Sequence, residues 1–343
     1  MAAALYDPTA GYYNRSDLTR WGRTGDYRTS PECTYLFGAT FARFFAKIFQ
    51  QLGEPKTWTI VESGAGNGEF AGAVLEKLKA DYPFVFEATR YIVDDVSEDS
   101  RRRAEVRLKS VADKVQYKRL NEITAINPGI FFSNELVDAF PVHLLTVSNS
   151  HLRELYVRLT SAHQFEFVDG PLSTSKLDEF VRENPLVLKE GQVVEINLQL
   201  FDWLVEIENK LTTGFVITVE YGAEEEELYG APERFKGTLR AFHQHRFVEN
   251  VLSAPGMYDI TSTINWTQLR KFGEQLGFET ASFSNLDQFL LNEGLLEEVQ
   301  RVFTTEQSQV EKLRTTTQAR EMVLPGGMAS HFQVLVQRKS LRS

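Results

Sequence analysis

The chain has 343 residues, of which 42% are hydrophobic and 24% charged, and its formal net charge is −10. These values are typical of a soluble globular protein, and no apolar run is long enough to cross a bilayer. The negative charge argues against nucleic acid or an anionic membrane as a partner. A single cysteine, Cys33, excludes an intramolecular disulfide and favours a reducing compartment.

The first residues, MAAALYDPTAGYYN, indicate where the protein is expected to act. They lack the cationic and apolar regions of a secretory signal, and they are acidic where a transit peptide would be Arg-rich. We therefore expect a protein of the bacterial cytoplasm, or of the mitochondrial matrix if the source is eukaryotic.

The pattern along the first half of the chain is that of an α/β protein. A turn-rich, aromatic stretch over 1–32 is followed by a helical pattern over 35–52, and we assign 1–55 to an N-terminal cap segment. Strands and helices then alternate, with strands at 58–64, 90–96, 115–120 and 129–136 and helices at 69–82 and 97–110. Ser97 is the expected N-cap of the second helix. This alternation implies a parallel sheet with helices on both faces.

The second half adds insertions to the main domain, which we assign to 56–343. Alternating apolar and polar residues predict β-hairpins at about 142–185, a loop fills about 223–262, and helical patterns fill about 286–325. Core elements resume at 197–211 (helix), 214–222 (strand), 265–277 (helix), 278–284 (strand) and 331–339 (strand). The last strand follows helices rather than a crossover, so it is expected to lie antiparallel. The prediction is a Rossmann-like, mostly parallel seven-stranded sheet with an antiparallel last strand.

Three glycines follow the first strand at every second position: Gly64, Gly66 and Gly68. In an open α/β sheet, ligands bind beyond the carboxyl ends of the strands, where bare backbone allows close approach. A dinucleotide site has the spacing G-x-G-x-x-G and places a pyrophosphate on the helix N-terminus. Here the spacing is G-x-G-x-G and the helix begins with Glu69, which would repel a phosphate. The alternative is a turn that serves only close packing.

The second strand ends in two acids, Asp94 and Asp95, where an acid can accept hydrogen bonds from ribose hydroxyls. Asp95 lies 27 residues after Gly68, and a loop over 81–89 accounts for the long spacing. Strand alternation lets one of the two acids face a ligand, and we favour Asp95. The alternative is a solvated acid at the end of a strand.

The arrangement E-x-G-x-G-x-G resembles the first motif of class I S-adenosylmethionine-dependent methyltransferases. Several stretches in the same order resemble the MidA-like family of these enzymes, whose mitochondrial members are complex I assembly factors that methylate arginine. The most specific stretches are GDYRTSPE and SNELVDAFPVH, and the others are ALYDPTAGYY, VESGAGNGEF, VEYG, GTLRAFHQH, PGMYDITSTINW and FLLNEGLLE. The chain departs from the family pattern at Ser63, Asn67 and Glu220 and in its DDVS stretch.

The resemblance implies S-adenosyl-L-methionine as cofactor. It implies a cofactor site at Glu62, Gly64, Ala65, Gly66, Gly68, Asp95 and Val96, with Asp26, Ser30 and Pro31 closing over the amino-acid part. The expected partner is a protein with an accessible arginine, such as a respiratory complex I subunit or its bacterial counterpart. A homodimer is a further expectation.

The exit of the fourth strand holds the candidate catalytic residues Asn134, Glu135 and Asp138. A guanidinium stays protonated and is poorly nucleophilic, so paired carboxylates would bind its fork and localise its charge. We expect Glu135 and Asp138 to orient the acceptor and Asn134 to contact the cofactor or the substrate amide. The alternative for Asp138 is a helix cap. Asp259 and Thr261 are expected to line the substrate cleft or to cap a turn.

Two other functions stay open at this point. A nucleotide-dependent oxidoreductase uses the same fold class, although the glycine spacing and Glu69 disfavour it. A non-catalytic assembly or scaffolding protein would keep the fold and use its acidic surface to hold a partner. His243 and His245 have a spacing that suits a metal, but no third ligand with a matching pattern stands near them in the sequence.

Overall fold

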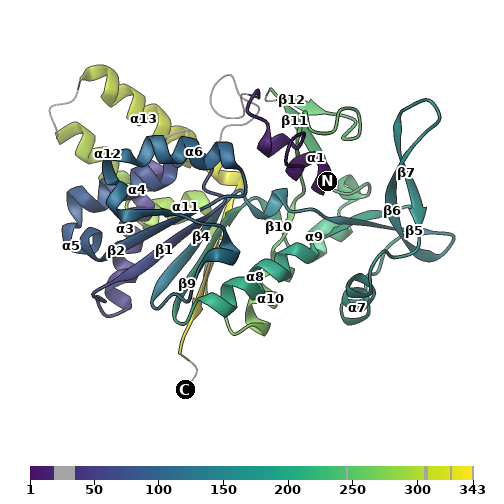
Figure 1. The fold of residues 1–343 in the computed structure, drawn as a ribbon, viewed down its shortest axis with the longest axis horizontal. Coiled ribbons are helices and arrows are strands. Elements are labelled where there is room, and N and C mark those ends of the chain that lie inside the picture. Colours follow the sequence, from purple (N-terminus) through teal and green to yellow (C-terminus); the bar gives the residue numbers. More distant parts are fainter. Residues whose placement is uncertain (19–34, 245, 305–307, 325–326, 342–343) are drawn as a thin grey trace.

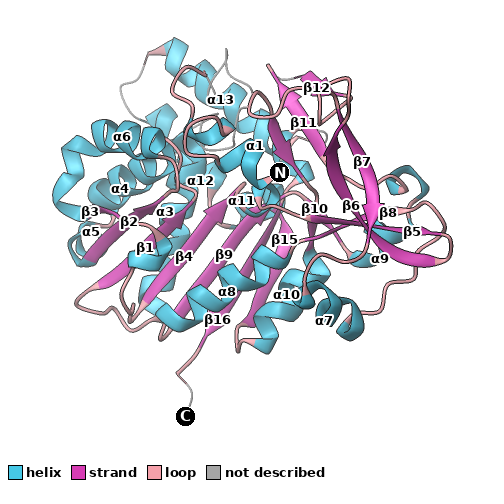
Figure 2. Ribbon diagram, turned by 45° about the vertical axis from the view of Figure 1, so that its right-hand side comes forward, coloured by secondary structure: helices cyan, strands magenta, loops and turns pink. Residues whose placement is uncertain are grey.

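The computed structural model describes residues 1–18, 35–244, 246–304, 308–324 and 327–341. Its centre is a seven-stranded sheet in the order β15-β16-β9-β4-β1-β2-β3 (Figures 1 and 2). The strands are β1 (Trp58–Ser63), β2 (Thr89–Asp94), β3 (Val115–Tyr117), β4 (Gly129–Asn134), β9 (Gly214–Glu220), β15 (Glu279–Asn285) and β16 (Gln333–Lys339). Strands β3, β2, β1, β4 and β9 pair in parallel, whereas β16 is antiparallel to both β9 and β15. The predicted sheet, including its antiparallel last strand, is confirmed.

The helices after β15 explain why β16 runs backwards. The helical insertion consists of α11 (Leu286–Asn292), α12 (Leu295–Thr304) and α13 (Gln309–Val323). It begins directly after Asn285 and returns the chain to Gln333, which pairs with Asn285. The chain never crosses to the other end of the sheet, as a parallel connection would require. Strand β16 therefore begins at the same end of the sheet at which β15 ends, and it runs in the opposite direction.

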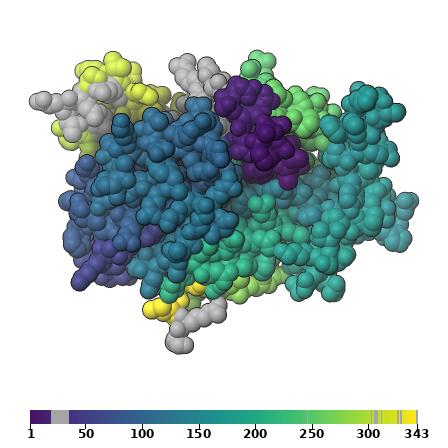
Figure 3. Space-filling model, viewed as in Figure 1, coloured from purple at the N-terminus to yellow at the C-terminus, as the bar shows by residue number. Residues whose placement is uncertain are grey.

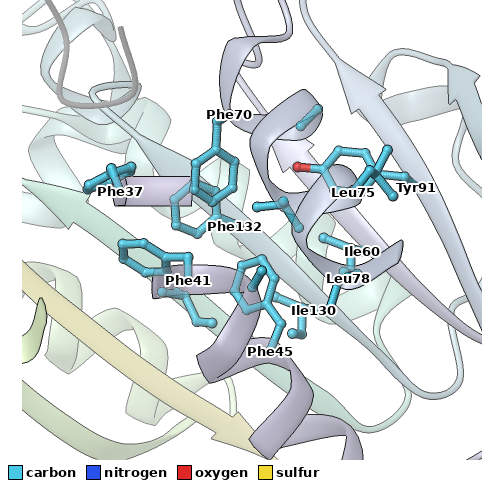
Figure 4. Close-up of a cluster of buried hydrophobic side chains, with 14 of the residues drawn as sticks. Phe37, Phe41, Phe45, Ile60, Phe70, Leu75, Leu78, Tyr91, Ile130 and Phe132 are labelled. Carbon is cyan, nitrogen blue, oxygen red and sulfur yellow. The ribbon is translucent and has the colours of Figure 1, made fainter. Parts of the chain in front are cut away.

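One face of the sheet carries an aromatic core that involves α3 (Tyr35–Gln51) and α4 (Glu69–Asp81). Phe41 of α3 contacts Phe70 of α4 and Phe132 of β4, and the last two rings stack at 4.2 Å (Figure 4). The same core includes residues of α5 (Pro83–Ala88), α6 (Glu98–Arg107), α11 and α13. Helix α3 thus packs into the main core, while the division into 1–55 and 56–343 stays a prediction.

The opposite face is covered by α8 (Leu198–Lys210) and α10 (Trp266–Gln275), and α7 (Ser175–Glu183) packs against α10 through Phe180 and Phe272. The insertion before α8 is a four-stranded antiparallel sheet in the order β7-β6-β5-β8, and its β6–β7 hairpin projects from the molecule (Figure 1). These strands are β5 (His143–Ser148), β6 (His151–Leu159), β7 (Phe165–Gly170) and β8 (Val193–Ile196). The β5–β6 and β6–β7 hairpins lie within the expected range, which also contains α7, whereas β8 lies beyond it, and the bounds of the insertion stay a prediction.

Two segments expected to be loops contain regular elements. Residues 83–88 form α5, which begins at Pro83, a residue that suits the first turn of a helix. Residues 223–262 contain α9 (Glu225–Gly230) and the sheet of β11 (Arg240–His243), β12 (Arg246–Val248) and β13 (Asp259–Thr261). Strands of three or four residues are too short to show a clear alternation in the sequence. A further pair, β10 (Gly222–Ala223) and β14 (Ile264–Asn265), is parallel.

The N-terminal segment, residues 1–18, contains α1 (Ala2–Tyr6) and packs on the β11–β13 sheet through Leu5, Tyr12, Ala241 and Ile260. Figure 3 shows it, in purple, on the surface between the residues of the main sheet and the insertions. The short 3-10 helices of the chain are Tyr12–Asn14, Leu108–Lys114, Leu120–Glu122, Val137–Ala139, Pro232–Arg234 and Met328–His331. Among the described residues, no helix has the length and apolar character needed to span a bilayer.

Candidate functional site

A cleft of about 1300 Å³ opens beyond the carboxyl ends of β1, β2 and β4. Nine of the predicted site residues line it: Glu62, Gly64, Ala65, Gly66, Asp95, Val96, Asn134, Glu135 and Asp138. Gly68 is not among the lining residues. Asp26, Ser30 and Pro31 lie outside the described residues. The cleft thus joins the predicted cofactor residues and the predicted acceptor residues in one space.

The glycine turn between β1 and α4 uses backbone angles that favour glycine. Gly64, Gly66 and Gly68 have φ values of 74°, 55° and 76°. The Gly64 N–H donates to the carbonyl oxygen of Asp94 at 2.7 Å, which ties the turn to the end of β2. A Cβ at Gly68 would lie 2.9 Å from the Cβ of Ala104 in α6. Close packing, the alternative weighed for the turn, therefore explains Gly68 and also applies to Gly64, where a Cβ would lie 2.9 Å from Cδ1 of Leu136, although Gly64 and Gly66 line the cleft.

Glu62 closes the floor of the cleft at the end of β1. Its side chain is buried, and Oε2 accepts a hydrogen bond from the Tyr91 hydroxyl at 2.7 Å. Burial raises the pKa of Glu62 to about 8, while the Tyr91 hydrogen bond lowers that pKa and the nearby charge of Asp95 raises it further. Glu62 therefore holds a proton at neutral pH when no cation is near.

Asp94, the last residue of β2, and Asp95, which follows it, both line the cleft. The alternation of side chains along the strand therefore does not decide which of the two acids faces a ligand. Asp95 accepts hydrogen bonds from the backbone N–H groups of Gly66 and Ser97, each at 2.8 Å. Asp94 accepts hydrogen bonds from the Ser63 hydroxyl and the Leu120 N–H, each at 2.9 Å. Burial raises the pKa of Asp94 to about 7. Ser63, a departure from the family pattern, thus holds a buried acid in place.

Residues 135–138, which we call the acceptor loop, follow β4 in a tight turn. Glu135 has a φ of 52°, an unusual value for a residue other than glycine. The Asn134 amide donates to Glu135 Oε1 at 3.0 Å, and the Tyr221 hydroxyl donates to Asp138 Oδ2 at 2.5 Å. Burial raises the pKa of Asp138 to about 6, although the Tyr221 hydrogen bond and the charge of Arg240 both lower it. The two predicted carboxylates therefore sit on one short, constrained turn.

Acidic side chains dominate the lining of the cleft. It contains eleven acids and two arginines, Arg102 and Arg119, and the acids are Glu62, Glu69, Asp94, Asp95, Glu98, Asp99, Glu135, Asp138, Asp202, Glu206 and Asp259. Glu69, expected to repel a phosphate, forms an ion pair with Arg107 at 3.0 Å, so its own charge is partly offset. Asp99 likewise pairs with Arg102 and Arg103, and Asp202 pairs with Lys176. Because Glu62 is also neutral, the preference for a cation rests on the remaining acids.

Several lining residues escaped the sequence analysis. Tyr6, Tyr13, Asn121, Trp203 and Tyr221 line the cleft from the N-terminal segment, the 3-10 helix Leu120–Glu122, α8 and the end of β9. The three tyrosines lie in the stretches ALYDPTAGYY and VEYG, but nothing in those stretches assigns them to a site, and the positions of all five residues depend on how distant segments pack. Asp259 and Thr261 also line the cleft, as one of their two expected roles requires. The Tyr13 hydroxyl donates to Asp259 at 2.7 Å and so connects the N-terminal segment to β13.

No group of three side chains suited to a metal occurs within the described part of the chain. His243 lies at the end of β11, and its sequence neighbour His245 falls outside that part.

The sheet order, the antiparallel β16, the glycine turn after β1 and the acids after β2 define the class I methyltransferase fold. Residues 40–284 match the model of a family described as "Putative S-adenosyl-L-methionine-dependent methyltransferase". That match covers well over half of the chain, and the chain belongs to this family.

Two curated relatives illustrate the similarity. The Drosophila melanogaster protein named protein arginine methyltransferase NDUFAF7 homolog, mitochondrial, is 25% identical over 81% of this chain and 66% of its own length. The human protein arginine methyltransferase NDUFAF7, mitochondrial, is 23% identical over 86% of this chain and 69% of its own length. The chain thus spans about two thirds of the length of these relatives.

Among solved structures, a Burkholderia thailandensis protein bound to S-adenosyl-homocysteine superposes on the whole chain with a TM-score of 0.86. It is 24% identical, and the match covers 87% of that protein. A native crystal structure from the same organism gives a TM-score of 0.84, also at 24% identity. These likenesses confirm the fold.

Proposed function

We propose that this protein is an S-adenosylmethionine-dependent methyltransferase that methylates an arginine side chain of a protein. The observation that carries the proposal is the cleft with eleven acids and two arginines. A sulfonium methyl donor and a guanidinium acceptor are both cations, and both gain from such a lining. A dinucleotide would bring a pyrophosphate next to the same carboxylates. The names of the relatives, which include arginine methylation, support the proposal.

The residues of the glycine turn fit the cofactor. Gly64 and Gly66 line the cleft, and Asn134 Oδ1 is buried without a hydrogen-bond partner among the described residues. Asp95 would hold the ribose hydroxyls, Val96 would contact the adenine, and Asn134 would accept a hydrogen bond from the cofactor amine or the substrate amide. When bound, the cofactor supplies an activated methyl group for an in-line displacement. Gly68 would support the site through helix packing.

The acceptor loop would position the guanidinium. Glu135 and Asp138 stand three residues apart on one turn, so their carboxylates can bind the planar fork of an arginine. Binding in this way would hold the nucleophilic nitrogen toward the methyl group, and orientation of this kind lowers the barrier to transfer. The hydrogen bond from Tyr221 and the charge of Arg240 both favour the ionised form of Asp138.

Labelling of a cell extract tests the proposal. Purified protein is incubated with the extract and a cofactor labelled at the methyl group, and the extract proteins are then hydrolysed to amino acids. We expect label in methylarginine. Glu135→Gln and Asp138→Asn should each lower the transfer rate by about 100-fold while the affinity for the cofactor stays within about threefold.

Glu233→Gln, a change of an exposed acid outside the cleft, is the control and should keep the parental rate. Label in another amino acid would contradict arginine as the acceptor. A Glu135→Gln variant that transfers methyl at the parental rate would remove Glu135 from the mechanism.

The acceptor is proposed to be a subunit of respiratory complex I or its bacterial counterpart, and a homodimer is a further proposal. Both names quoted above include the word mitochondrial, which supports a mitochondrial site for a eukaryotic chain. For a bacterial chain we propose the cytoplasm.

A further inference from the structure

Glu220, the last residue of β9, lies beneath the acceptor loop and has no exposed surface. Its Oε1 accepts hydrogen bonds from the backbone N–H groups of Leu136 at 2.8 Å, Val137 at 2.7 Å and Asp138 at 3.4 Å. A single side-chain oxygen thus receives the donors of the whole first turn of the 3-10 helix that carries Asp138.

Glu220 is the side-chain acceptor for the N–H groups of Leu136 and Val137, whereas the N–H of Asp138, at the longest distance, also interacts with the carboxylate of Asp138 itself. The first N–H groups of a helical turn lack partners within the turn, and the residue that precedes this turn, Leu136, offers no side-chain cap. Glu135 begins the loop at a strained φ of 52° and is anchored by its N–H on the carbonyl of Val219. Without Glu220, the N–H groups of Leu136 and Val137 would lose their acceptor and the strained conformation would lose its support.

The surroundings of Glu220 favour its neutral form. Its Oε2 is buried and has no hydrogen-bond partner among the described residues. Glu135 and Asp138 stand above it, and the Tyr221 hydroxyl is directed to Asp138. The guanidinium of Arg240 lies 4.7 Å from the centre of the Tyr221 ring and acts on Asp138. Burial and the charges of Asp138 and Glu135 raise the pKa of Glu220 well above its ordinary value, although the hydrogen bonds from the N–H groups of Val137 and Leu136 lower it.

We propose that Glu220 is a positioning residue that, as a neutral carboxylic acid, fixes the acceptor loop so that Glu135 and Asp138 alone present charge to the substrate. The inference rests on the proposed arginine methyltransferase function. It adds a residue that touches neither cofactor nor substrate, because Glu220 lies below the lining of the cleft. A third carboxylate charge at this depth would repel the two acids above it and favour their protonated forms, which would weaken their pairing with the guanidinium.

Two substitutions separate what Glu220 contributes as a hydrogen-bond acceptor from what a charge on its side chain would contribute. Glu220→Gln keeps an oxygen acceptor for the three N–H groups and is always neutral, whereas Glu220→Leu removes the acceptor. Glu195→Leu is the matched control, because Glu195 also accepts backbone N–H groups, from Thr238 at 2.6 Å and Leu239 at 2.9 Å, outside the cleft lining. The readouts are kcat, KM, the Kd for S-adenosylmethionine and amide hydrogen exchange at 136–138.

We expect Glu220→Gln to keep kcat within about threefold and to keep the protection of the amides at 136–138. Glu220→Leu should lower kcat by about 100-fold, leave the cofactor Kd within about threefold and accelerate exchange at 136–138 by at least about tenfold. Glu195→Leu should accelerate exchange at 238–239 and leave exchange at 136–138 and kcat near the parental values.

If Glu220→Gln lost as much activity as Glu220→Leu, the proposal that Glu220 acts in its neutral form would be overturned, because a negative charge at this position would then be required. Unchanged exchange at 136–138 in Glu220→Leu would overturn the positioning role. Hydrogen exchange needs no substrate, so it decides the role of Glu220 even if the parent protein fails to methylate arginine. If Glu220→Leu does not fold, the Gln variant alone still tests the neutral form.

Discussion

At the scale of single residues, Glu62 couples the cleft to the stability of the fold. Its burial raises the pKa to about 8 from an ordinary value of 4.5. Between these two values the folded chain keeps a proton that the unfolded chain releases. The contribution of Glu62 to the free energy of unfolding therefore falls as the pH rises through this window, and it is constant below about 4.5 and above about 8.

The expected fall of the unfolding free energy with rising pH can be tested with Glu62→Gln, in which the amide oxygen can still accept a hydrogen bond from the Tyr91 hydroxyl. From about pH 5 to about pH 8.5, the unfolding free energy of the parent in urea should fall more than that of the variant. The difference should be on the order of 3 kcal/mol. Asp94 and Asp138 titrate in both proteins, so their effects cancel in the comparison. Parallel pH curves would show that Glu62 is ionised in the fold.

Sequence reasoning at this scale succeeded where a residue's role is local. Ser97 was expected to cap its helix, and its side chain does accept the N–H of Ser100. Sequence reasoning failed where the role of a residue depends on which residues of other strands lie beside it. The contact of Glu62 with Tyr91 and the cap that Glu220 gives to the acceptor loop both join residues far apart in the chain. No pattern within one segment indicates such a pair.

At the scale of elements, the packing of α4 against α6 depends on Gly68. Gly68 and Gly53 both have positive φ values, 76° and 80°, but a Cβ at Gly53 would meet nothing within 4 Å. Gly53→Ala therefore measures the cost of the backbone angle alone. Gly68→Ala adds a contact of 2.9 Å with the Cβ of Ala104, which the helix pair can relieve only by moving apart.

We expect Gly53→Ala to lower the free energy of unfolding by about 1 kcal/mol and Gly68→Ala to lower it by a further 1–3 kcal/mol or so. Urea denaturation of both variants beside the parent provides the measurement. Equal losses in the two variants would mean that α4 and α6 are not closely packed at this point.

The strands and helices of the main sheet could be predicted well because their periodic patterns extend over several residues and their ends carry glycines or acids. Sequence reasoning missed α5 and the small β11–β13 sheet. A six-residue helix that opens with Pro83 looks like a turn, and strands as short as β12 have no measurable alternation. These short elements are stabilised by tertiary contacts, such as the packing of Leu5 and Tyr12 against Ala241 and Ile260.

At the scale of the whole molecule, the cleft gathers groups from Ala2 to Thr261. Residues at the ends of β1, β2 and β4 could be predicted, because ligands in such folds bind beyond the carboxyl ends of the strands. Those from the N-terminal segment, α8 and β13 could not, because their approach depends on the insertions. The result is a strongly acidic cavity, although the net charge of −10 is spread over 343 residues.

The central claim is that this cavity suits a cationic methyl donor and repels a pyrophosphate. Calorimetric titration of the purified protein with S-adenosylmethionine and, separately, with NADH tests it most directly. We expect saturable binding of one S-adenosylmethionine per chain, at least about tenfold tighter than any binding of NADH. Tighter binding of NADH, displaced by neither the methyl donor nor S-adenosyl-homocysteine, would contradict the account.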